Sequence, residues 1–471
     1  MSTTLREPVS KVDTAWWHME SPVNHMVVTS VLLFDRPLRR ERVRALFEER
    51  MLRFPRFRQR IVTSLRGLNE PQWELDPDFD IDAHIHHLAL PAPGDEQALR
   101  DLVGDIASLP LDPSAPLWAS WIVDGVNGRG SALISRIHHC IADGIALTRL
   151  LLSLTDEDPT DRSGQTEWWE ATPQRTRGEP EHRGLVRGAA HVAGMAARES
   201  LQSVRHPQHA ADLAGEALGD ARALARVTFL PAEAETSLRR PLGTHKAVAW
   251  TEEIPLAGVK RIAHSVGGTV NDVLVAAVTG GLRTYLLERG EVVPEGLELH
   301  ATVPVNLRPL DGPIALGNRF GLIYPTLPVG VPDTMDRLRA VKKAIDDIKA
   351  TPEAVVAITV LDALGHTPKA VEELFIQFFT SKSSMVLTNV PGPRHRRRFA
   401  GVPLRRVVSW APPSGSLPMS VSIFSYAGQV TIAVLGDTRC VPDAEGLVRA
   451  IEHEVAELRR AGLAQRRAAS R

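Results

Sequence analysis

Two adjacent histidines, an aspartate and a glycine stand close together in the segment HHCIADG at residues 138–144. Neutral imidazole accepts a proton near pH 7, and an alcohol that attacks a thioester needs such a base because it is too weak an acid to ionise by itself. Side chains that follow one another in an extended segment point in opposite directions. We therefore expect one of His138 and His139 to face a cavity as a general base and the other to be a structural support.

Asp143 and Gly144 are expected to hold the turn that carries the two histidines. Asp143 suits an ion pair with an arginine, for which Arg308 is one candidate, and Gly144 allows a close backbone approach where a Cβ atom would clash. An isolated pair of histidines more often caps a core strand, so this structural interpretation stays open. The complete pattern, with its aspartate and glycine, favours a functional site.

Two other chemistries are conceivable for the same segment. His138, His139 and Asp143 are metal-ligand types, but adjacent histidines that point apart converge poorly on one ion. Cys140 is a nucleophile type beside His139, but neighbouring side chains rarely meet and an apolar flank raises the pKa of a thiol. The motifs of serine hydrolases, nucleotide hydrolases and dinucleotide oxidoreductases do not follow any predicted strand. Direct transfer without a metal or a covalent enzyme intermediate is the simplest prediction.

The bulk composition limits the remaining classes. A chain of 471 residues with 43% hydrophobic residues is long enough for more than one core, so we expect two domains. A net charge of -1 favours neither nucleic acid nor an anionic membrane as a partner, and two cysteines are too few for a disulfide framework. With no signal-peptide pattern and no apolar run of about 18 residues, we expect a protein that is neither exported nor membrane-spanning.

The elements that must position these residues alternate between strand and helix patterns in residues 1–155, where we expect an N-terminal α/β domain. Strands are expected over 26–34, 117–124 and 131–137, and helices around 43–47 and 99–106. The Asn and Gly residues of GVNGRG suit a hairpin between the last two strands. The second of these strands leads directly into His138 and His139.

A second domain of strands and helices is expected at 241–465, before a basic tail at 466–471. Residues 156–240 are expected to be a linker and bridging helices, although the alanine-rich part at 185–225 also suits a membrane surface. Thr269 has the spacing of a capping box with Asp272 and begins a long predicted helix. The other predicted elements are strands at 247–254, 299–305, 384–390, 420–425 and 430–435, and helices at 333–350 and 353–377.

With these motifs in place, the chain resembles the bacterial wax ester synthase/diacylglycerol acyltransferase family over nearly its whole length. The resemblance is carried by LPAPGD (90–95), PLW (116–118), HHCIADG (138–144), GGTVNDVLVAAVTGGLR (from 267), PVNLR (304–308), LGNRFG (316–321) and TNVPGP (388–393). The HHxxxDG pattern alone belongs to a wider superfamily that includes chloramphenicol acetyltransferase and peptide-synthetase condensation domains. The segment IALTRLLL after Gly144 departs from the serine-containing stretch of many members, which leaves the preferred alcohol size open.

The resemblance implies an α/β fold of two chloramphenicol-acetyltransferase-like domains, with mixed sheets, flanking helices and an active-site tunnel at the interface. It implies that acyl-CoA and an alcohol enter from opposite mouths, and that acyl-CoA is a substrate, with no cofactor and no metal. His139 would take the hydroxyl proton and then protonate the departing thiolate, supported by His138 and Asp143. The implied acceptor is diacylglycerol, with long-chain alcohols as a second class.

Asn271 is expected in the first turn of the helix from Thr269, where its amide and the free backbone N–H groups suit a substrate or a developing oxyanion. Plain helix capping is an equal alternative. The resemblance implies substrate-binding roles for five further residues: Pro116, Leu117, Trp118, Asn318 and Asn389. Trp118 also suits a core position in its strand, and Asn318 is expected in a tight turn near the domain interface.

The run RHRRR at 394–398 is a local cation cluster that suits the phosphates of coenzyme A, although a solvated loop face is the commoner explanation. Lipid substrates imply a cytoplasmic protein that associates peripherally with the inner membrane or lipid droplets, and nucleic acid is not an expected partner. Two rival functions stay open. One is a related transferase or condensation enzyme with another acceptor or a carrier-bound donor, and the other is a lipid-binding protein without turnover.

Overall fold

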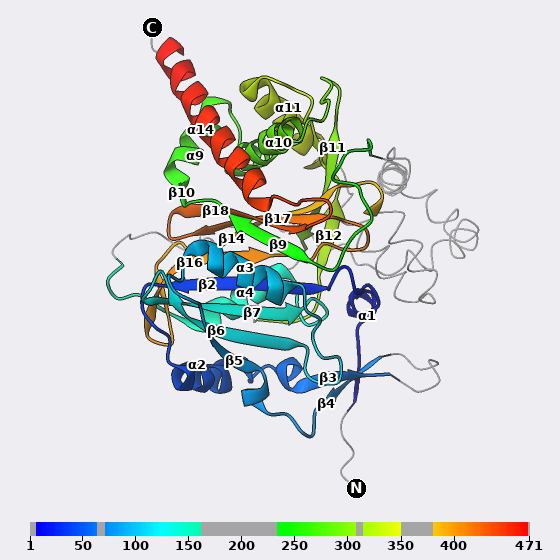
Figure 1. Ribbon diagram of the computed structural model, residues 1–471, viewed down its shortest axis with the longest axis vertical. Helices are drawn as coiled ribbons and strands as arrows, with labels where there is room; N and C mark the ends of the chain where they lie inside the picture. The colour runs from blue at the N-terminus through cyan, green and yellow to red at the C-terminus, as the bar shows by residue number, and fades with distance from the viewer. Residues whose placement is uncertain (1–5, 64–70, 162–232, 308–313, 350–379, 470–471) are drawn as a thin grey trace, which may run out of the picture.

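The computed structural model describes residues 6–63, 71–161, 233–307, 314–349 and 380–469 of the chain. Three predicted features lie outside these residues: the alanine-rich segment at 185–225, the helix at 353–377 and Arg308. The described residues form two large sheets that lie one above the other, with several helices on the outer side of the second sheet (Figure 1). The α/β class predicted from the sequence is confirmed.

The first sheet has seven strands and carries the HHCIADG segment at the end of strand β7. Its order is β5 (Ile85–Ala89), β6 (Trp118–Val126), β7 (Gly130–His138), β2 (Val27–Phe34), β16 (Val402–Trp410), β15 (Arg397–Phe399) and β8 (Thr155–Glu157). The antiparallel register of β2 and β7 places Val27 opposite His138. The predicted hairpin joins β6 and β7, and its Asn127 and Gly128 have positive φ angles.

Strands β15 and β16 come from the C-terminal part of the chain and yet complete the first sheet. Strand β16 pairs antiparallel with β2, with Val408 opposite Val31. The domain limits of 1–155 and 241–465 remain predictions, and a division along the sequence alone separates strands that share hydrogen bonds. Local periodicity cannot reveal such a crossing, because it predicts that a segment is a strand but not which strand it pairs with.

The second sheet has eight strands and is covered by helices on its outer face (Figure 1). Its main path is β10 (Ile254–Pro255), β18 (Gln429–Asp437), β17 (Met419–Tyr426), β14 (Met385–Pro391), β11 (Leu299–Asn306) and β12 (Phe320–Ile323), with β9 (Lys246–Trp250) on β18 and β13 (Thr326–Leu327) on β11. The covering helices are α9 (Leu256–Ser265), α10 (Val270–Glu288), α11 (Thr334–Lys349) and α14 (Ala444–Ala469). Strand β14 runs parallel to both of its neighbours.

Helix α10 begins at the predicted capping box. Thr269 accepts a hydrogen bond from the backbone of Asp272, and the Asp272 carboxylate accepts one from the backbone of Thr269. Further along, Gly281 lets α14 approach closely, because a Cβ atom there would lie 2.4 Å from Cγ1 of Ile451 and 2.9 Å from its backbone. The glycine therefore allows the backbone of α10 to pack directly against Ile451 of α14.

Helix α3 (Glu96–Ala107) packs between the two sheets, as its predicted apolar face requires. Leu99, Val103 and Ile106 are buried on this face. They share one hydrophobic cluster with Trp250 of the second sheet and Trp410 of the first. This shared core fixes the position of the second sheet on the first, and therefore the geometry of any cavity between them.

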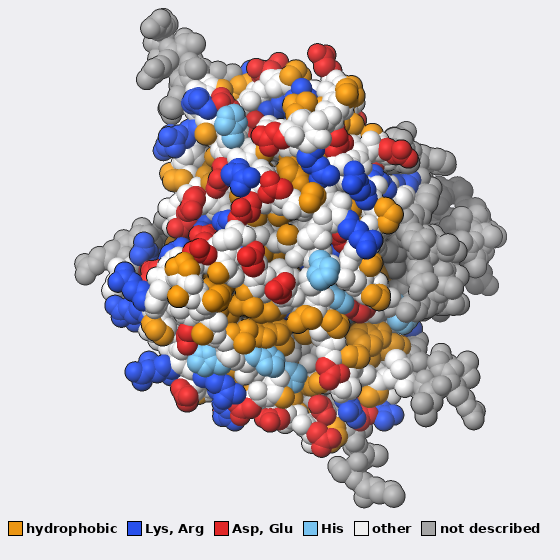
Figure 2. All heavy atoms as spheres, in the orientation of Figure 1, with side chains coloured by type: hydrophobic (Ala, Val, Ile, Leu, Met, Phe, Trp, Pro, Cys, Tyr) orange, Lys and Arg blue, Asp and Glu red, His pale blue; other side chains and the backbone are white. Residues whose placement is uncertain are grey.

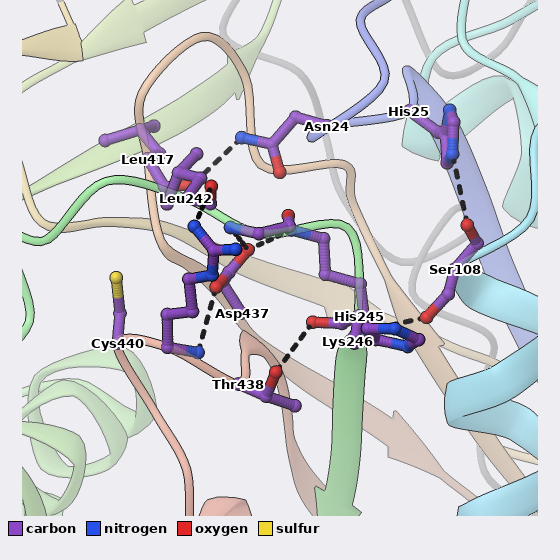
Figure 3. A network of polar contacts seen from close by, with 12 residues as sticks. Asn24, His25, Ser108, Leu242, His245, Lys246, Leu417, Asp437, Thr438 and Cys440 are labelled. Carbon is purple, nitrogen blue, oxygen red and sulfur yellow. Dashed lines mark hydrogen bonds and ion pairs between the residues drawn. The ribbon is translucent and has the colours of Figure 1, made fainter.

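A buried ion pair lies within the second sheet, next to this shared core. Lys246 at the start of β9 lies 2.7 Å from Asp437 at the end of β18, and both side chains are almost fully buried. Burial lowers the pKa of Lys246, while the hydrogen bond to Asp437 acts in the opposite direction. The backbone N–H of Lys246 also donates to the hydroxyl of Ser108, which follows α3 (Figure 3).

The loop before β2 is anchored on the same network (Figure 3). His25 Nε2 lies 3.3 Å from the carbonyl oxygen of Ser108. The side-chain amide of Asn24 donates to the carbonyls of Gly415 and Leu417, which precede β17. Both halves of the protein therefore hold the loop that leads into β2, next to the histidine pair of β7.

Three smaller features complete the description. A three-stranded sheet of β1 (Glu7–Pro8), β4 (Gln72–Leu75) and β3 (Gln59–Val62) has no counterpart in the sequence predictions. Acidic and basic side chains are interspersed on the face in Figure 2, and an apolar band crosses its lower half. In the described part of the chain, no helix combines the length and the apolar character needed to span a membrane.

Candidate active site

The turn between β7 and helix α4 (Gly144–Ser153) positions the candidate site. Asp143 is the N-cap of α4, and its Oδ1 accepts a hydrogen bond of 2.8 Å from the backbone of Ala146. Its Oδ2 accepts a second one of 3.1 Å from the backbone of Arg319. The segment around Gly317 reinforces the turn, because its backbone exchanges hydrogen bonds with Ile141 and Asp143. The predicted arginine partner, Arg308, lies outside the described residues.

Gly144 corrects one detail of the sequence prediction. A Cβ atom on Gly144 would meet no other atom within 4 Å, so no close backbone approach requires a glycine here. Gly144 instead lines the cavity described below, where the missing side chain leaves room. The absence of a side chain at Gly144 therefore enlarges the cavity, and the backbone there does not require a glycine.

The two histidines point in opposite directions, as expected for neighbours at the end of a strand. His138 turns away from the cavity: its Nδ1 accepts a hydrogen bond from the backbone of Cys140, and its Nε2 lies 3.4 Å from Glu20 Oε2. His139 lines the cavity, and its Nδ1 is buried without a hydrogen-bond partner among the described residues. An acceptor role for His138 Nδ1 places its proton on Nε2, toward the carboxylate.

Glu20 supports His138 from the loop before β2. Its carboxylate accepts hydrogen bonds of 2.6 Å from the backbone of Met26 and lies 2.6 Å from Nδ1 of His25. Burial alone would raise the pKa of Glu20, but the hydrogen bonds from His138, His25 and Met26 outweigh burial and lower the pKa to about 2. Glu20 is therefore a carboxylate at neutral pH, and its negative charge faces the ring of His138.

The imidazole of His139 packs against two aromatic rings. Trp16 of helix α1 (Lys11–His18) stacks on the imidazole with 4.3 Å between ring centroids, and Phe320 meets it edge-on at 5.6 Å. Burial lowers the pKa of His139 below its ordinary value of 6.5, although the charge of Asp143 acts in the opposite direction. The imidazole is therefore neutral at pH 7, the protonation state of a general base.

Asn318 clamps the histidine turn onto α1. Its side-chain amide donates to the carbonyl oxygen of His139 and to Oδ1 of Asp13, both at 2.7 Å. Asp13 also accepts a hydrogen bond from the backbone of Asn318, and burial raises the pKa of the Asp13 carboxyl. Asn318 lies near the interface, as predicted, and touches the backbone of the histidine rather than the cavity.

A cavity of ≈ 210 Å³ lies beside His139, between the first sheet with α4 on one side and the edge of the second sheet on the other. The first part of the chain contributes side chains from β2, β6, β7 and α4: Val28, Ser30, Leu32, Trp118, Ser120, Leu133, Ser135, Ile137, Leu147, Leu150 and Leu151. The C-terminal part contributes Pro304, Asn306, Phe320, Thr388, Asn389, Val407, Ser409 and Phe424. The lining is mostly apolar, and its amides come from the second sheet.

The part of this cavity that Phe47 and Phe399 line, which we call its deep end, is rich in aromatic side chains. Helix α2 (Arg40–Leu46) continues as a π-helical turn over Phe47–Met51, and both end residues of that turn line the cavity. Phe47 packs edge-on against Trp118 and Phe399. The cavity therefore extends from the His139 imidazole to a group of packed aromatic rings.

The remaining predicted residues lie at different distances from this cavity. Trp118 lines it and also donates a hydrogen bond of 2.9 Å to the carbonyl of Phe57, so its core position and its place in the cavity wall coincide. Pro116 and Leu117 are buried beside it and are not among the lining residues. Leu117 helps to position the histidine turn, because its carbonyl accepts a hydrogen bond from the backbone of His138.

Asn271 and Asn389 are brought together although they lie far apart in the sequence. The side-chain amide of Asn389, on β14, donates to Oδ1 of Asn271 at 2.9 Å. Asn389 lines the cavity, and Asn271 lies in the first turn of α10 next to it. The pair therefore places the N-terminus of α10 at the edge of the cavity.

The basic run at 394–398 does not line the cavity. Arg397 lies in β15, where its side chain donates to the hydroxyl of Thr155 and pairs with Glu157. The guanidinium of Arg398 donates to the carbonyl of Gly401. At least these two arginines therefore contact residues at the edge of the first sheet, and a role of the run in binding phosphates stays a prediction.

The alternatives based on Cys140 and on a metal receive no structural support. The Cys140 thiol is buried, and burial raises its pKa well above the ordinary value. A protonated, buried thiol is a poor nucleophile. Within the described ranges, no group of three or more His, Cys, Asp or Glu side chains is arranged to hold a metal ion.

Three residues that lie at the candidate site were not predicted from the sequence: Asp13, Trp16 and Glu20. Asp13 and Trp16 are three residues apart, so they lie on one face of a helix, which was the available signal. No local sequence pattern indicates that this face packs against the turn after β7. The contact between the helix and the turn is visible only in the folded protein.

Comparisons with known proteins relate this chain to a described family. The family model described as the wax ester synthase/diacylglycerol acyltransferase catalytic domain matches residues 9–274, and the model described as the C-terminal domain of the same proteins matches residues 316–459. A Mycobacterium tuberculosis protein named as a probable diacylglycerol O-acyltransferase is 32% identical over 410 residues, which cover 86% of this chain and 84% of that protein.

Two solved structures share the fold. The wax ester synthase/diacylglycerol acyltransferase from Marinobacter aquaeolei VT8 matches with a TM-score of 0.67 and 22% identity, over 97% of this chain and 99% of that chain. The first condensation domain of the calcium-dependent antibiotic synthetase matches with a TM-score of 0.59 and 17% identity, over 98% of this chain and 97% of that chain. The predicted two-domain acetyltransferase-like fold is thereby confirmed.

Proposed function

The chain belongs to the wax ester synthase/diacylglycerol acyltransferase family, and on that premise we propose that it transfers a fatty acyl group from coenzyme A to the free hydroxyl of diacylglycerol. The observation that carries the proposal is the buried His139, whose imidazole lines a deep apolar cavity formed by both halves of the chain. Burial lowers the pKa of this imidazole, which suits it to accept a proton at neutral pH.

In the proposed reaction, His139 accepts the proton of the acceptor hydroxyl while the hydroxyl oxygen attacks the thioester carbonyl. A C–O bond forms and the tetrahedral intermediate carries the negative charge on the former carbonyl oxygen. The C–S bond then breaks, and the imidazolium of His139 returns its proton to the coenzyme A thiolate. Atoms and protons balance, so the reaction requires no cofactor beyond acyl-CoA as the activated donor.

The supporting residues have distinct proposed roles. Asp143 stabilises the turn by capping α4, and its charge lies close enough to favour the imidazolium that forms on His139. His138 and Asn318 position the backbone on either side of His139. Asn271 is a candidate donor to the oxyanion, because its partner Asn389 lines the cavity.

The polarity of the cavity suggests how the donor binds. The wall formed by the first sheet and α4 is mostly apolar and matches an alkyl chain. Asn306, Thr388 and Asn389 lie on the second-sheet side and match the polar thioester and the pantetheine amides. We therefore place the acyl chain along the first sheet, with its carbonyl next to His139.

Product analysis tests the donor and the acceptor together. Purified protein is incubated with hexadecanoyl-CoA and either diacylglycerol or hexadecanol, and the lipids are separated by thin-layer chromatography. Triacylglycerol formation is expected, and a wax ester is expected as a second product. Release of free fatty acid only, or no use of any CoA donor, would contradict the proposal.

Lipid acceptors imply that the protein works at a lipid surface, so we also propose peripheral association with the cytoplasmic side of the inner membrane or with lipid droplets. The apolar band on the surface supports contact with lipid (Figure 2). Sedimentation with diacylglycerol-containing vesicles tests this proposal: the protein is expected in the vesicle pellet. Complete retention in the supernatant, together with active turnover of dispersed substrate, would contradict it.

A further inference from the structure

Four serines, which we call the serine row, form a line across the wall of the cavity. Ser120 on β6 lies opposite Ser135 on β7, which in turn lies opposite Ser30 on β2. Ser30 lies opposite Ser409 on β16. All four line the cavity. Directly opposed residues of neighbouring strands have Cβ atoms about 5 Å apart, so the row is continuous across four strands.

Larger apolar side chains flank the serine row on both sides. On β2 they are Val28 and Leu32, and on β7 they are Leu133 and Ile137. Side chains two residues apart share one face of a strand, which explains why all of them meet the same cavity. The serine row is therefore a passage of small side chains between two bands of larger ones.

The serine row crosses the cavity between its reactive end and its deep end. Ser135 precedes His139 by four positions, roughly 13 Å along a strand. Beyond the row the cavity continues to Leu133 and Phe399. At the reactive end, Nδ1 of the buried His139 has no hydrogen-bond partner among the described residues. An acyl chain whose carbonyl lies at His139 reaches the row only when it is long.

Two of the four hydroxyls in the row do not need a polar substrate. Ser120 Oγ and Ser135 Oγ lie 3.0 Å apart and form a hydrogen bond with each other. Such sideways pairing satisfies hydroxyls that would otherwise be buried unpaired under an alkyl chain. Serine therefore provides a small side chain over which an apolar chain can pass, whereas a leucine would close the passage.

We propose that the serine row allows the protein to accept long acyl chains, because it is the passage between the reactive end of the cavity and its deep end. This inference rests on the proposed function, since it requires the acyl chain of the donor to enter the cavity from His139. Short chains end before the row. Long chains cross it.

The test is a chain-length profile with butyryl-, decanoyl- and hexadecanoyl-CoA and one common acceptor. Ser135→Leu and Ser30→Leu are expected to lower the ratio of the hexadecanoyl rate to the butyryl rate by roughly tenfold or more, because only the long chain must cross the row. Ser135→Ala is the matched control, because it removes the hydroxyl but keeps the passage open. It is expected to keep the wild-type profile.

Several results would overturn the inference. One is an unchanged hexadecanoyl-to-butyryl ratio in folded leucine variants, and another is a changed ratio in Ser135→Ala. A shift in alcohol preference alone would assign the passage to the acceptor. If both leucine variants unfold, Ser409→Val tests the same passage with the same expected result. Wild-type protein that uses no acyl-CoA of any length contradicts the proposed function, whereas butyryl transfer with an unchanged ratio contradicts only the inference.

Discussion

His139 depends on residues that lie far from it in the sequence. Its ring stacks on Trp16, and its carbonyl accepts a hydrogen bond from Asn318. Its neighbour His138 faces Glu20 instead of the cavity. Two adjacent residues of the same type therefore have different environments, one suited to proton transfer and the other to orientation.

The pH dependence of turnover follows from the buried state of His139. Burial lowers its pKa from 6.5 to about 4, so the neutral base persists at neutral pH and is lost only as the pH falls toward 4. We expect kcat to be flat from pH 8 to about 5 and to fall at lower pH. Steady-state rates, with circular dichroism at each pH to confirm folding, measure this profile. An acid limb centred above 6.5 would contradict the assignment.

Glu20→Gln tests whether the charge facing His138 matters. The substitution keeps the size of the side chain but removes the carboxylate that accepts from Met26 and pairs with His25. We expect kcat to fall roughly ten- to hundredfold, with little change in KM, because the turn is displaced rather than the substrate site. Kinetics with hexadecanoyl-CoA measure the two constants separately.

The control for this variant is Glu48→Gln, which removes a carboxylate of similar type from an exposed ion pair with Arg44. It is expected to behave like wild type. If Glu20→Gln matches Glu48→Gln in kcat, then Glu20 has no positioning role.

At the scale of elements, strong local patterns predicted some of the strands and helices but not all of them. The apolar face of α3, the apolar run in β2 and the capping box at Thr269 each indicate one element by themselves. The small sheet of β1, β3 and β4 was missed, because its strands are only two to four residues long. Strands β15 and β16 were not predicted, and their entry into the first sheet could not be, because pairing across the chain leaves no local signal.

Gly281→Ala tests the close packing of α10 against α14. The added Cβ would lie 2.4 Å from Ile451 Cγ1 and 2.9 Å from the Ile451 backbone, so the helices must separate. We expect the free energy of unfolding to fall by about 1–3 kcal/mol, measured by chemical denaturation. Gly296→Ala is the control, since its Cβ would meet nothing within 4 Å. Equal stability of the two variants would contradict the packing account.

At the scale of the whole molecule, the cavity exists because two sheets from different parts of the chain meet. The sequence predicted that the site lies at this interface, together with His138, His139 and Asp143. It did not reveal Asp13 and Glu20, which act through contacts with the turn after β7. Motifs identify candidate reactive residues, whereas their contacts with distant residues become visible only when the chain is folded.

Asp437→Ala tests the buried ion pair between β9 and β18 of the second sheet. The substitution would leave Lys246 charged and buried without its partner, so we expect a loss of about 3–5 kcal/mol in unfolding free energy. The control is Asp347→Ala, which removes the partner of Lys343 in an exposed pair of the same 2.7 Å length. That variant is expected to change stability by less than about 1 kcal/mol. Similar losses in both variants would contradict a special role for the buried pair.

The central claim is that His139 is the general base, and the most direct test is the kcat/KM of His139→Ala with hexadecanoyl-CoA and diacylglycerol. The account predicts a loss of about 10²- to 10⁴-fold with thermal unfolding close to wild type, because the imidazole is needed for proton transfer. Turnover within a few-fold of wild type in the folded variant would contradict it.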